Sequence, residues 1–238
     1  MKLLIMRHGD PDYEHDSLTE KGFREAELLG ERLAREPISK IYCSPLGRAR
    51  ATAAPTCRRL GIEPEICDWL KEFPAPPIVT PGQRGPIAVW NCEPAFWSSY
   101  PEHFDRERWR ESPVFRGTGT GEIYDDVCQN FDRLVARHGF VRDGMLYHIQ
   151  PGYGDGDDTI AFFCHLGLGN SLLAHITGVA LPLWWHTVFL PTSSVTTVLM
   201  ERHLPEEPIA IGRVVGVGDV SHLYAGGERV SSSGLHRI

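Results

Sequence analysis

The residues best suited to chemistry come directly after apolar runs that are typical of buried strands. Arg7 and His8 follow the run 3–6, and His165 follows a second run, 160–164. A strand that ends in this way presents the next side chains from its exit turn. An imidazole can attack a phosphorus atom, and a guanidinium matches phosphate oxygens. The pattern is therefore typical of a site that holds a phosphoryl group.

A local concentration of arginine lies between these two places. The segment 43–62 contains four arginines and no acidic residue, although the whole chain has a net charge of −7. Within it, Ser44 and Pro45 lead into a helix expected over 48–60. The free backbone N–H groups at a helix start favour an anion. We therefore expect an anion site at this helix N-terminus, with Arg48 as its first ligand.

The elements that must position these residues alternate between strands and helices, which indicates an α/β fold. Ligands of open α/β sheets bind outside the carboxyl ends of the strands, so we expect His8 and His165 on the same rim. Strands are predicted at 2–6, 40–43, 65–68, 159–164, 195–200 and 209–217, and helices at about 19–35, 48–60, 125–138, 170–176 and 184–189.

Local signals refine these elements. Thr19 or Ser17 is expected to cap the first helix, and Pro55 is expected to kink or break the second. A glycine- and aspartate-rich turn is expected over 150–158, and a polar, irregular tail after Leu223.

The stretch 73–121 differs from the rest of the chain because it is rich in proline and glycine. We interpret it as an irregular cap with short helices, inserted at about 73–121 into a single domain over 1–238. The expected fold is a three-layer α/β/α sandwich with a mostly parallel central sheet. Trp90, Trp97 and Trp109 of the cap fit the lining of a substrate pocket as well as a small hydrophobic core, and both interpretations stay open.

Bulk composition excludes several classes of protein. The net charge of −7 argues against a nucleic-acid-binding surface and against anionic membranes, and no apolar run reaches membrane-spanning length. The N-terminus lacks the pattern of a signal peptide. The six cysteines form no C-x-x-C pair, and the histidines show no metal-ligand spacing. We therefore expect a cytoplasmic protein that uses no metal and no other cofactor.

Taken in order, the motifs resemble those of the histidine phosphatase superfamily, also called phosphoglycerate-mutase-like proteins. Arg-His-Gly alone is weak evidence, but after an N-terminal strand and before a Ser-Pro-Leu-Gly-Arg block it is specific. The resemblance rests on LLIMRHG at 3–9, LT at 18–19 with Gly22 and Ala26, YCSPLGR at 42–48 with TA at 52–53, LKE at 70–72 and CH at 164–165.

The resemblance implies a role for each of five residues. His8 is implied as the nucleophile, whose unprotonated nitrogen forms a phosphohistidine. Arg7, Arg48 and His165 are implied to hold the phosphoryl oxygens, a task that favours a protonated His165 ring. Glu72 is implied as the general acid, which requires burial to raise its pKa.

The family contains phosphatases, mutases and binding modules, so the reaction needs a further criterion. The loop 10–16 after His8 holds four acidic residues, which would repel an anionic substrate body, and it departs from the pattern usual in the mutases. We therefore favour hydrolysis of a small phosphomonoester whose remaining part is neutral, cationic or aromatic. A phosphoglycerate mutase is the alternative. A binding module without turnover is a second alternative, although the retained His8 and Glu72 count against it.

No nucleic-acid or membrane partner is expected, and a homodimer stays open. His222 either approaches the site or has a surface or capping role.

Overall fold

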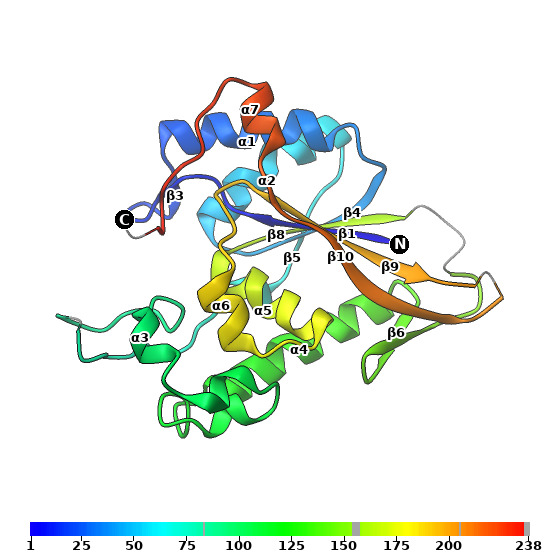
Figure 1. The fold of residues 1–238 in the computed structure, drawn as a ribbon. Helices are drawn as coiled ribbons and strands as arrows, with labels where there is room; N and C mark the ends of the chain where they lie inside the picture. Colours follow the sequence, from blue (N-terminus) through cyan, green and yellow to red (C-terminus); the bar gives the residue numbers. More distant parts are fainter. Residues whose placement is uncertain (83, 154–157, 205, 236–238) are drawn as a thin grey trace.

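The computed structural model describes residues 1–238 with the exception of 83, 154–157, 205 and 236–238. A mixed sheet lies at the centre and helices cover both of its faces (Figure 1), which confirms the α/β class. The strands are β1 Lys2–Arg7, β2 Pro11–Asp12, β3 Ser17–Leu18, β4 Ile38–Cys43, β5 Glu65–Ile66, β6 Phe140–Asp143, β7 Leu146–Ile149, β8 Thr159–Cys164, β9 Val195–Arg202 and β10 Ile209–Asp219. The helices are α1 Glu20–Leu33, α2 Gly47–Leu60, η1 Asp68–Leu70, α3 Pro94–Trp97, η2 Pro101–Phe104, η3 Arg108–Glu111, α4 Thr120–Ala136, α5 Leu166–Thr177, α6 Leu181–Thr187 and α7 Ser221–Ala225.

The central sheet has eight strands in the order β5-β4-β8-β1-β9-β10-β7-β6. The strands β5, β4, β8 and β1 run parallel to one another. From β1 onwards every pairing is antiparallel. The sheet therefore has more antiparallel pairing than the mostly parallel sheet that we expected. The reason is that β6 with β7, and β9 with β10, pair as chain neighbours across short links, which only antiparallel strands can do.

Side chains along β1 alternate between two hydrophobic cores. Leu3 and Ile5 belong to the core shared with α4 and α5, whereas Leu4 and Met6 belong to the core shared with α1 and α2. Helices α1, α2 and α7 lie on one face of the sheet, and α4, α5 and α6 lie on the other (Figure 1). A strand covered on both faces must be apolar throughout, which explains the continuous apolar run before Arg7.

Two details of α1 and α2 were open or wrong in the sequence-based prediction. Thr19 rather than Ser17 caps α1, because its side-chain oxygen accepts the N–H of Gly22 at 3.0 Å. Pro55 lies inside α2 without breaking it. Its ring packs closely against α1, since a Cβ added to Gly30 would lie 2.9 Å from Pro55 Cβ. This packing offsets the hydrogen bond that a proline removes from a helix.

Within the described part of 73–121, the regular structure consists of α3, η2, η3, the start of α4 and one bridge between Ile78 and Ile87. Helix α4 begins about one turn earlier than expected, directly after Gly119 in the left-handed conformation at φ 79°. The cap boundaries at about 73–121 and the single domain over 1–238 stay predictions. The expected turn at 150–158 lies partly outside the described residues. The hairpin of β6 and β7 and the short helix α7 were not predicted.

Candidate active site

Three neighbouring parallel strands, β4, β8 and β1, end side by side. Ser44, His165 and His8 follow these strands in that spatial order. The Ser44 N–H donates to the carbonyl of Phe163 at 2.9 Å, and the His8 N–H donates to that of Cys164 at 3.0 Å. The ring centroids of His8 and His165 lie 5.2 Å apart. The register of the sheet thus places both histidines on the same rim.

His8 is buried and neutral. Burial, followed by the positive charge of Arg7, lowers the pKa of His8 to about 3. Its Nδ1 lies 2.7 Å from the carbonyl oxygen of Gly9, which can only accept a hydrogen bond. The proton of the neutral ring therefore sits on Nδ1, and the lone pair is on Nε2.

His165 is also buried, and its Nε2 lies 2.8 Å from the hydroxyl oxygen of Ser44. Burial and then the nearby His8 and arginines hold the pKa of His165 well below its usual value. The lowered pKa makes the His165 ring neutral, whereas we expected it to be protonated. The sequence indicated the phosphate chemistry but not how deeply His165 is buried. A neutral ring that accepts the Ser44 hydroxyl at Nε2 still carries a donor N–H at Nδ1.

Arg7 is fixed by backbone oxygens. Its Nη1 donates to the carbonyl of Leu190 at 2.7 Å, and its Nη2 donates to that of Ser233 at 3.2 Å. The guanidinium carbon also lies 5.2 Å from the centroid of the Phe189 ring. Burial lowers the pKa of Arg7, although not far enough to discharge a guanidinium. Arg7 is therefore a buried cation held in one orientation.

Three buried nitrogens of this cluster have no hydrogen-bond partner among the described residues. They are Nε of Arg7, Nε of Arg48 and Nδ1 of His165. Buried donors in proteins are almost always paired, and such exceptions point to a ligand or to catalysis. Both arginines and His165 also act electrostatically on one another or on His8. The arrangement fits a compact anion with several oxygens.

Arg48 is held by Asp16, which differs from the expected anion site at the start of α2. Nη1 of Arg48 donates to Oδ1 of Asp16 at 2.7 Å, and the N–H of Gly47 donates to Oδ2 at 2.6 Å. The carboxylate of Asp16 therefore takes the place at this helix N-terminus that we had assigned to a ligand. Sequence reasoning missed this contact because Asp16 lies in a loop far from Arg48 in the chain.

Glu72 is half-buried beside the N-terminus of α5. Its Oε1 accepts the N–H groups of Phe73 at 2.9 Å and of Leu168 at 3.0 Å. Burial raises the pKa of Glu72, while these two hydrogen bonds and the charge of Arg7 oppose the rise. The direction is the one that a general acid needs.

A fully buried glutamate was missed by the sequence analysis. Glu25 accepts the N–H of Asp10 at 2.9 Å and the hydroxyl of Thr192 at 3.1 Å, so it ties the loop after His8 to the loop before β9. Burial raises its pKa. Its spacing on the apolar face of α1, next to Ala26, was the available signal.

His222 contacts the loop before β9 through Ser193. Its Nε2 lies 3.1 Å from the hydroxyl of Ser193, and the Ser193 N–H donates to the carbonyl of His8 at 3.0 Å. Its contact with the site is therefore indirect, through the backbone.

Two carboxylates of the acidic loop 10–16 have side-chain partners. Asp12 pairs with His15 at 2.7 Å, and Asp16 pairs with Arg48.

Across the described ranges, no three His, Cys, Asp or Glu side chains gather as metal ligands would. The helices that the structure describes include none long and apolar enough to cross a membrane.

Comparison with known proteins agrees with this geometry. The model of the histidine phosphatase superfamily (branch 1) matches residues 3–84, which include most of β1, the Ser44–Arg48 segment and Glu72. A putative phosphoserine phosphatase 2 of Hydrogenobacter thermophilus is 23% identical over 211 residues, covering 84% of this chain and 90% of its own. Phosphoserine phosphatase 1 of the same organism is 26% identical over 164 residues, covering 63% and 72%.

Solved structures share the fold. A mycobacterial glucosyl-3-phosphoglycerate phosphatase has a TM-score of 0.60 at 19% identity, covering 91% of this chain and 98% of its own. A phosphoserine phosphatase of Entamoeba histolytica in complex with 3-phosphoglyceric acid has a TM-score of 0.62 at 17% identity, covering 93% and 98%. The match of the family model over residues 3–84, the two sequence relatives and this common fold make the chain similar to proteins of the histidine phosphatase superfamily.

Proposed function

We propose that the protein hydrolyses a small phosphomonoester through a phosphohistidine on His8. The observation that carries this proposal is the set of buried, unpaired donors on Arg7, Arg48 and His165 around a neutral His8. A phosphoryl group presents several negatively charged oxygens to match those donors. The lone pair on His8 Nε2 is then the nearest nucleophile.

In the first step, Nε2 of His8 forms a bond to phosphorus while the ester P–O bond breaks. Positive charge develops on the ring, and the Nδ1–H bond to the Gly9 carbonyl stabilises it. Negative charge spreads over the phosphoryl oxygens and is stabilised by Arg7, Arg48 and His165. The protonated carboxyl of Glu72 gives its proton to the leaving oxygen, so the alcohol departs uncharged.

In the second step, water attacks the phosphohistidine. The Glu72 carboxylate takes a proton from that water, the N–P bond breaks, and inorganic phosphate leaves. His8 returns to its neutral form with the proton still on Nδ1. Glu72 returns to its acid form, so the cycle needs no metal and no redox partner.

The named relatives support hydrolysis over the mutase alternative. Both Hydrogenobacter thermophilus proteins are described as phosphoserine phosphatases, one of them as putative, and the mycobacterial neighbour is a glucosyl-3-phosphoglycerate phosphatase. All three descriptions concern the removal of a phosphoryl group from a small alcohol. The substrate of this chain is accordingly proposed as a small phosphorylated alcohol.

The test is release of inorganic phosphate from a panel of phosphomonoesters, measured for the unmodified protein and for His8→Ala. We expect release by the unmodified protein and none by His8→Ala. Interconversion of 2- and 3-phosphoglycerate with little net phosphate release would identify a mutase instead. Binding of phosphate esters with no turnover of any of them would identify a binding module.

A further inference from the structure

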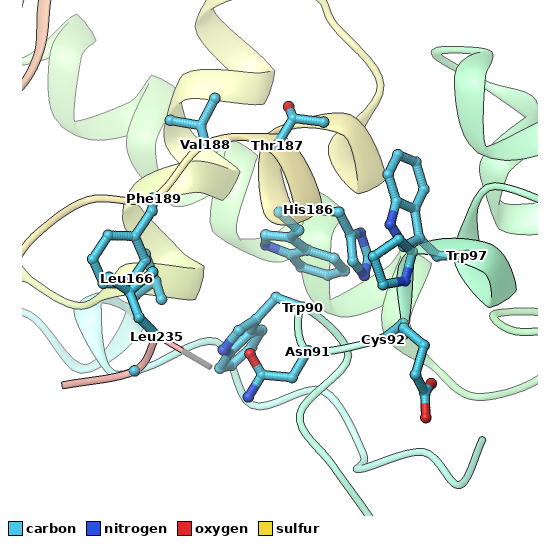
Figure 2. Close-up of a pocket in the computed structure, with 14 residues that line it drawn as sticks. Trp90, Asn91, Cys92, Trp97, Leu166, His186, Thr187, Val188, Phe189 and Leu235 are labelled. Carbon is cyan, nitrogen blue, oxygen red and sulfur yellow. The ribbon is translucent and has the colours of Figure 1, made fainter. Parts of the chain in front are cut away.

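A cavity of about 400 Å³ opens beside the proposed phosphate site. It is lined by aromatic side chains from three parts of the chain: Trp90 and Trp97 of the cap, Trp185 of α6, and Phe189 directly after α6. Figure 2 shows Trp90 and Phe189 on opposite sides of the space, with Trp97 and His186 at one end. Its volume lies within the range of pockets that bind small molecules.

One wall of this cavity reaches the proposed general acid. Trp90 packs on the backbone of Gly167 at the start of α5. A Cβ added to Gly167 would lie 2.6 Å from the Trp90 ring and 2.9 Å from Oε1 of Glu72. The indole and the carboxyl therefore meet at the same glycine, and a larger residue there would separate them.

The opposite wall reaches a proposed phosphate ligand. The Phe189 ring lies over Arg7, and a Cβ added to Gly234 would lie 3.1 Å from Nη2 of Arg7. Gly234 and Leu235 line the cavity together with Phe189. Arg7 and Glu72 do not line the cavity, but Arg7 adjoins one wall at Phe189 and Gly234, and Glu72 adjoins the other at Gly167, on which Trp90 packs. The leaving alcohol of an ester bound by Arg7 would project toward these walls.

The charge of the lining restricts what fits. Of the lining residues that the structure describes, none is lysine or arginine, and Glu93 is the one carboxylate. His186 stacks on Trp97 with the ring centroids 4.7 Å apart. Burial lowers the pKa of His186 to about 4, so it adds no positive charge at neutral pH. The Glu93 carboxylate accepts the Thr80 hydroxyl at 2.5 Å. An additional anionic group on the ligand would therefore find no cation in this lining.

The three tryptophans of the cap lie in two different environments. Trp109 is completely buried and packs edge-on against Phe115 and Tyr124, so it belongs to a hydrophobic core. Trp90 and Trp97 face the cavity. Trp109 therefore fits the hydrophobic-core interpretation, whereas the substrate-pocket interpretation stays a prediction for Trp90 and Trp97.

We propose that this aromatic cavity binds the alcohol part of the substrate, and that the preferred alcohol carries an aromatic ring without negative charge. The proposal rests on the proposed hydrolysis at His8 and adds the substrate class. The half-buried indole of Trp90 supplies a stacking surface for a flat ring, and Trp97, Trp185 and Phe189 complete an aromatic lining around it.

The test compares two substrates that have the same kind of leaving oxygen. 2-Phenylethyl phosphate and ethyl phosphate both release a primary alkoxide, so the ratio of their kcat/KM values measures ring binding rather than leaving-group reactivity. We expect a ratio of about ten or more, the size of one buried ring contact. A carboxylate added to the ring, as in 2-(4-carboxyphenyl)ethyl phosphate, should abolish the preference.

Two variants test whether the preference for 2-phenylethyl phosphate depends on this cavity. Trp90→Ala should bring the ratio down toward one, whereas Trp184→Phe should keep it. Trp184 is the matched control because it lies on α6 next to Trp185 but donates its indole N–H to Thr177 at 3.0 Å, outside the cavity. Glu93→Lys should raise kcat/KM for the carboxylated substrate relative to the uncharged one.

The two proposals can fail separately. Turnover that depends on His8 with a ratio near one, or a ratio that Trp90→Ala leaves intact, would overturn the aromatic pocket alone. Absence of turnover on every substrate would overturn the hydrolysis. In that case binding of 2-phenylethanol, followed by quenching of tryptophan fluorescence, still decides the pocket: saturable quenching that Trp90→Ala abolishes supports it, and no saturable quenching overturns it.

Discussion

The side chains of Ser44 and His165, 121 positions apart in the sequence, meet with 2.8 Å between Oγ and Nε2. Ser44 Oγ also accepts the N–H of Leu46 at 3.2 Å, which leaves its hydroxyl proton for the imidazole. This contact keeps the second ring nitrogen of His165 protonated and free of partners among the described residues. Ser44 is thus a positioning residue for His165.

Ser44→Ala should lower kcat/KM by about tenfold, because the His165 tautomer and orientation are no longer fixed. Ser44→Thr keeps the hydroxyl and should retain most of the activity. Steady-state kinetics of the two variants provide the check. An equal loss in both would mean that the size of residue 44, and not its hydroxyl, is what matters.

Asp16→Asn should lower kcat by about tenfold, because a neutral amide holds Arg48 less firmly than the carboxylate at 2.7 Å does. The matched control is Asp12→Asn in the same loop, where the carboxylate pairs with His15 instead. Activity of the Asp12 variant should stay close to that of the unmodified protein. Similar losses for both variants would point to the charge of the whole loop.

Glu72→Gln should slow the hydrolysis of esters with poor leaving groups most. The raised pKa of Glu72 means that its acid form persists above the ordinary carboxyl range, and that activity falls as pH rises through this raised pKa. The variant should lose that limb of the pH profile. A profile that keeps the limb in Glu72→Gln would assign it to another group.

Buried neutral histidines should make the fold sensitive to acid. Burial lowers the pKa of His222 from 6.5 to about 4, with Arg32 adding to the effect. Between these two values the unfolded chain binds a proton that the folded one does not, so the free energy of unfolding falls as pH falls. The slope is about 1.4 kcal/mol per pH unit for one such group. Urea unfolding between pH 4 and 6.5 should show a shallower slope in His222→Gln, with the exposed His203→Gln as control. An unchanged slope in His222→Gln would contradict this account.

The sequence was sufficient to predict the strand ends and the residues that they carry. Apolar runs locate β1 and β8, and the rule that parallel strands share a carboxyl edge is enough to bring His8 and His165 together. The charge state of His165 could not be predicted from the positions of the strands. The depth of burial of His165 depends on loops distant in the chain, and this depth makes its ring neutral.

Contacts between loops were also beyond the sequence. The pairing of Asp16 with Arg48 depends on how the loop after β1 folds over α2, and the role of Glu25 depends on Thr192 approaching from the loop before β9. The uninterrupted α2 depends on Gly30 in a different helix, which a rule about proline alone does not include. The pairing of Asp16, the role of Glu25 and the continuity of α2 each depend on a residue that is distant in the sequence.

The proposed hydrolysis depends on a covalent bond between phosphorus and Nε2 of His8. The most direct test is rapid acid-free quenching of the protein with a phosphomonoester, followed by mass spectrometry of the peptide that contains His8. We predict an acid-labile phosphoryl group on this residue, formed and lost at rates compatible with turnover and absent in His8→Ala. Turnover at full rate in His8→Ala, or a phosphoryl group on another residue, would contradict the account.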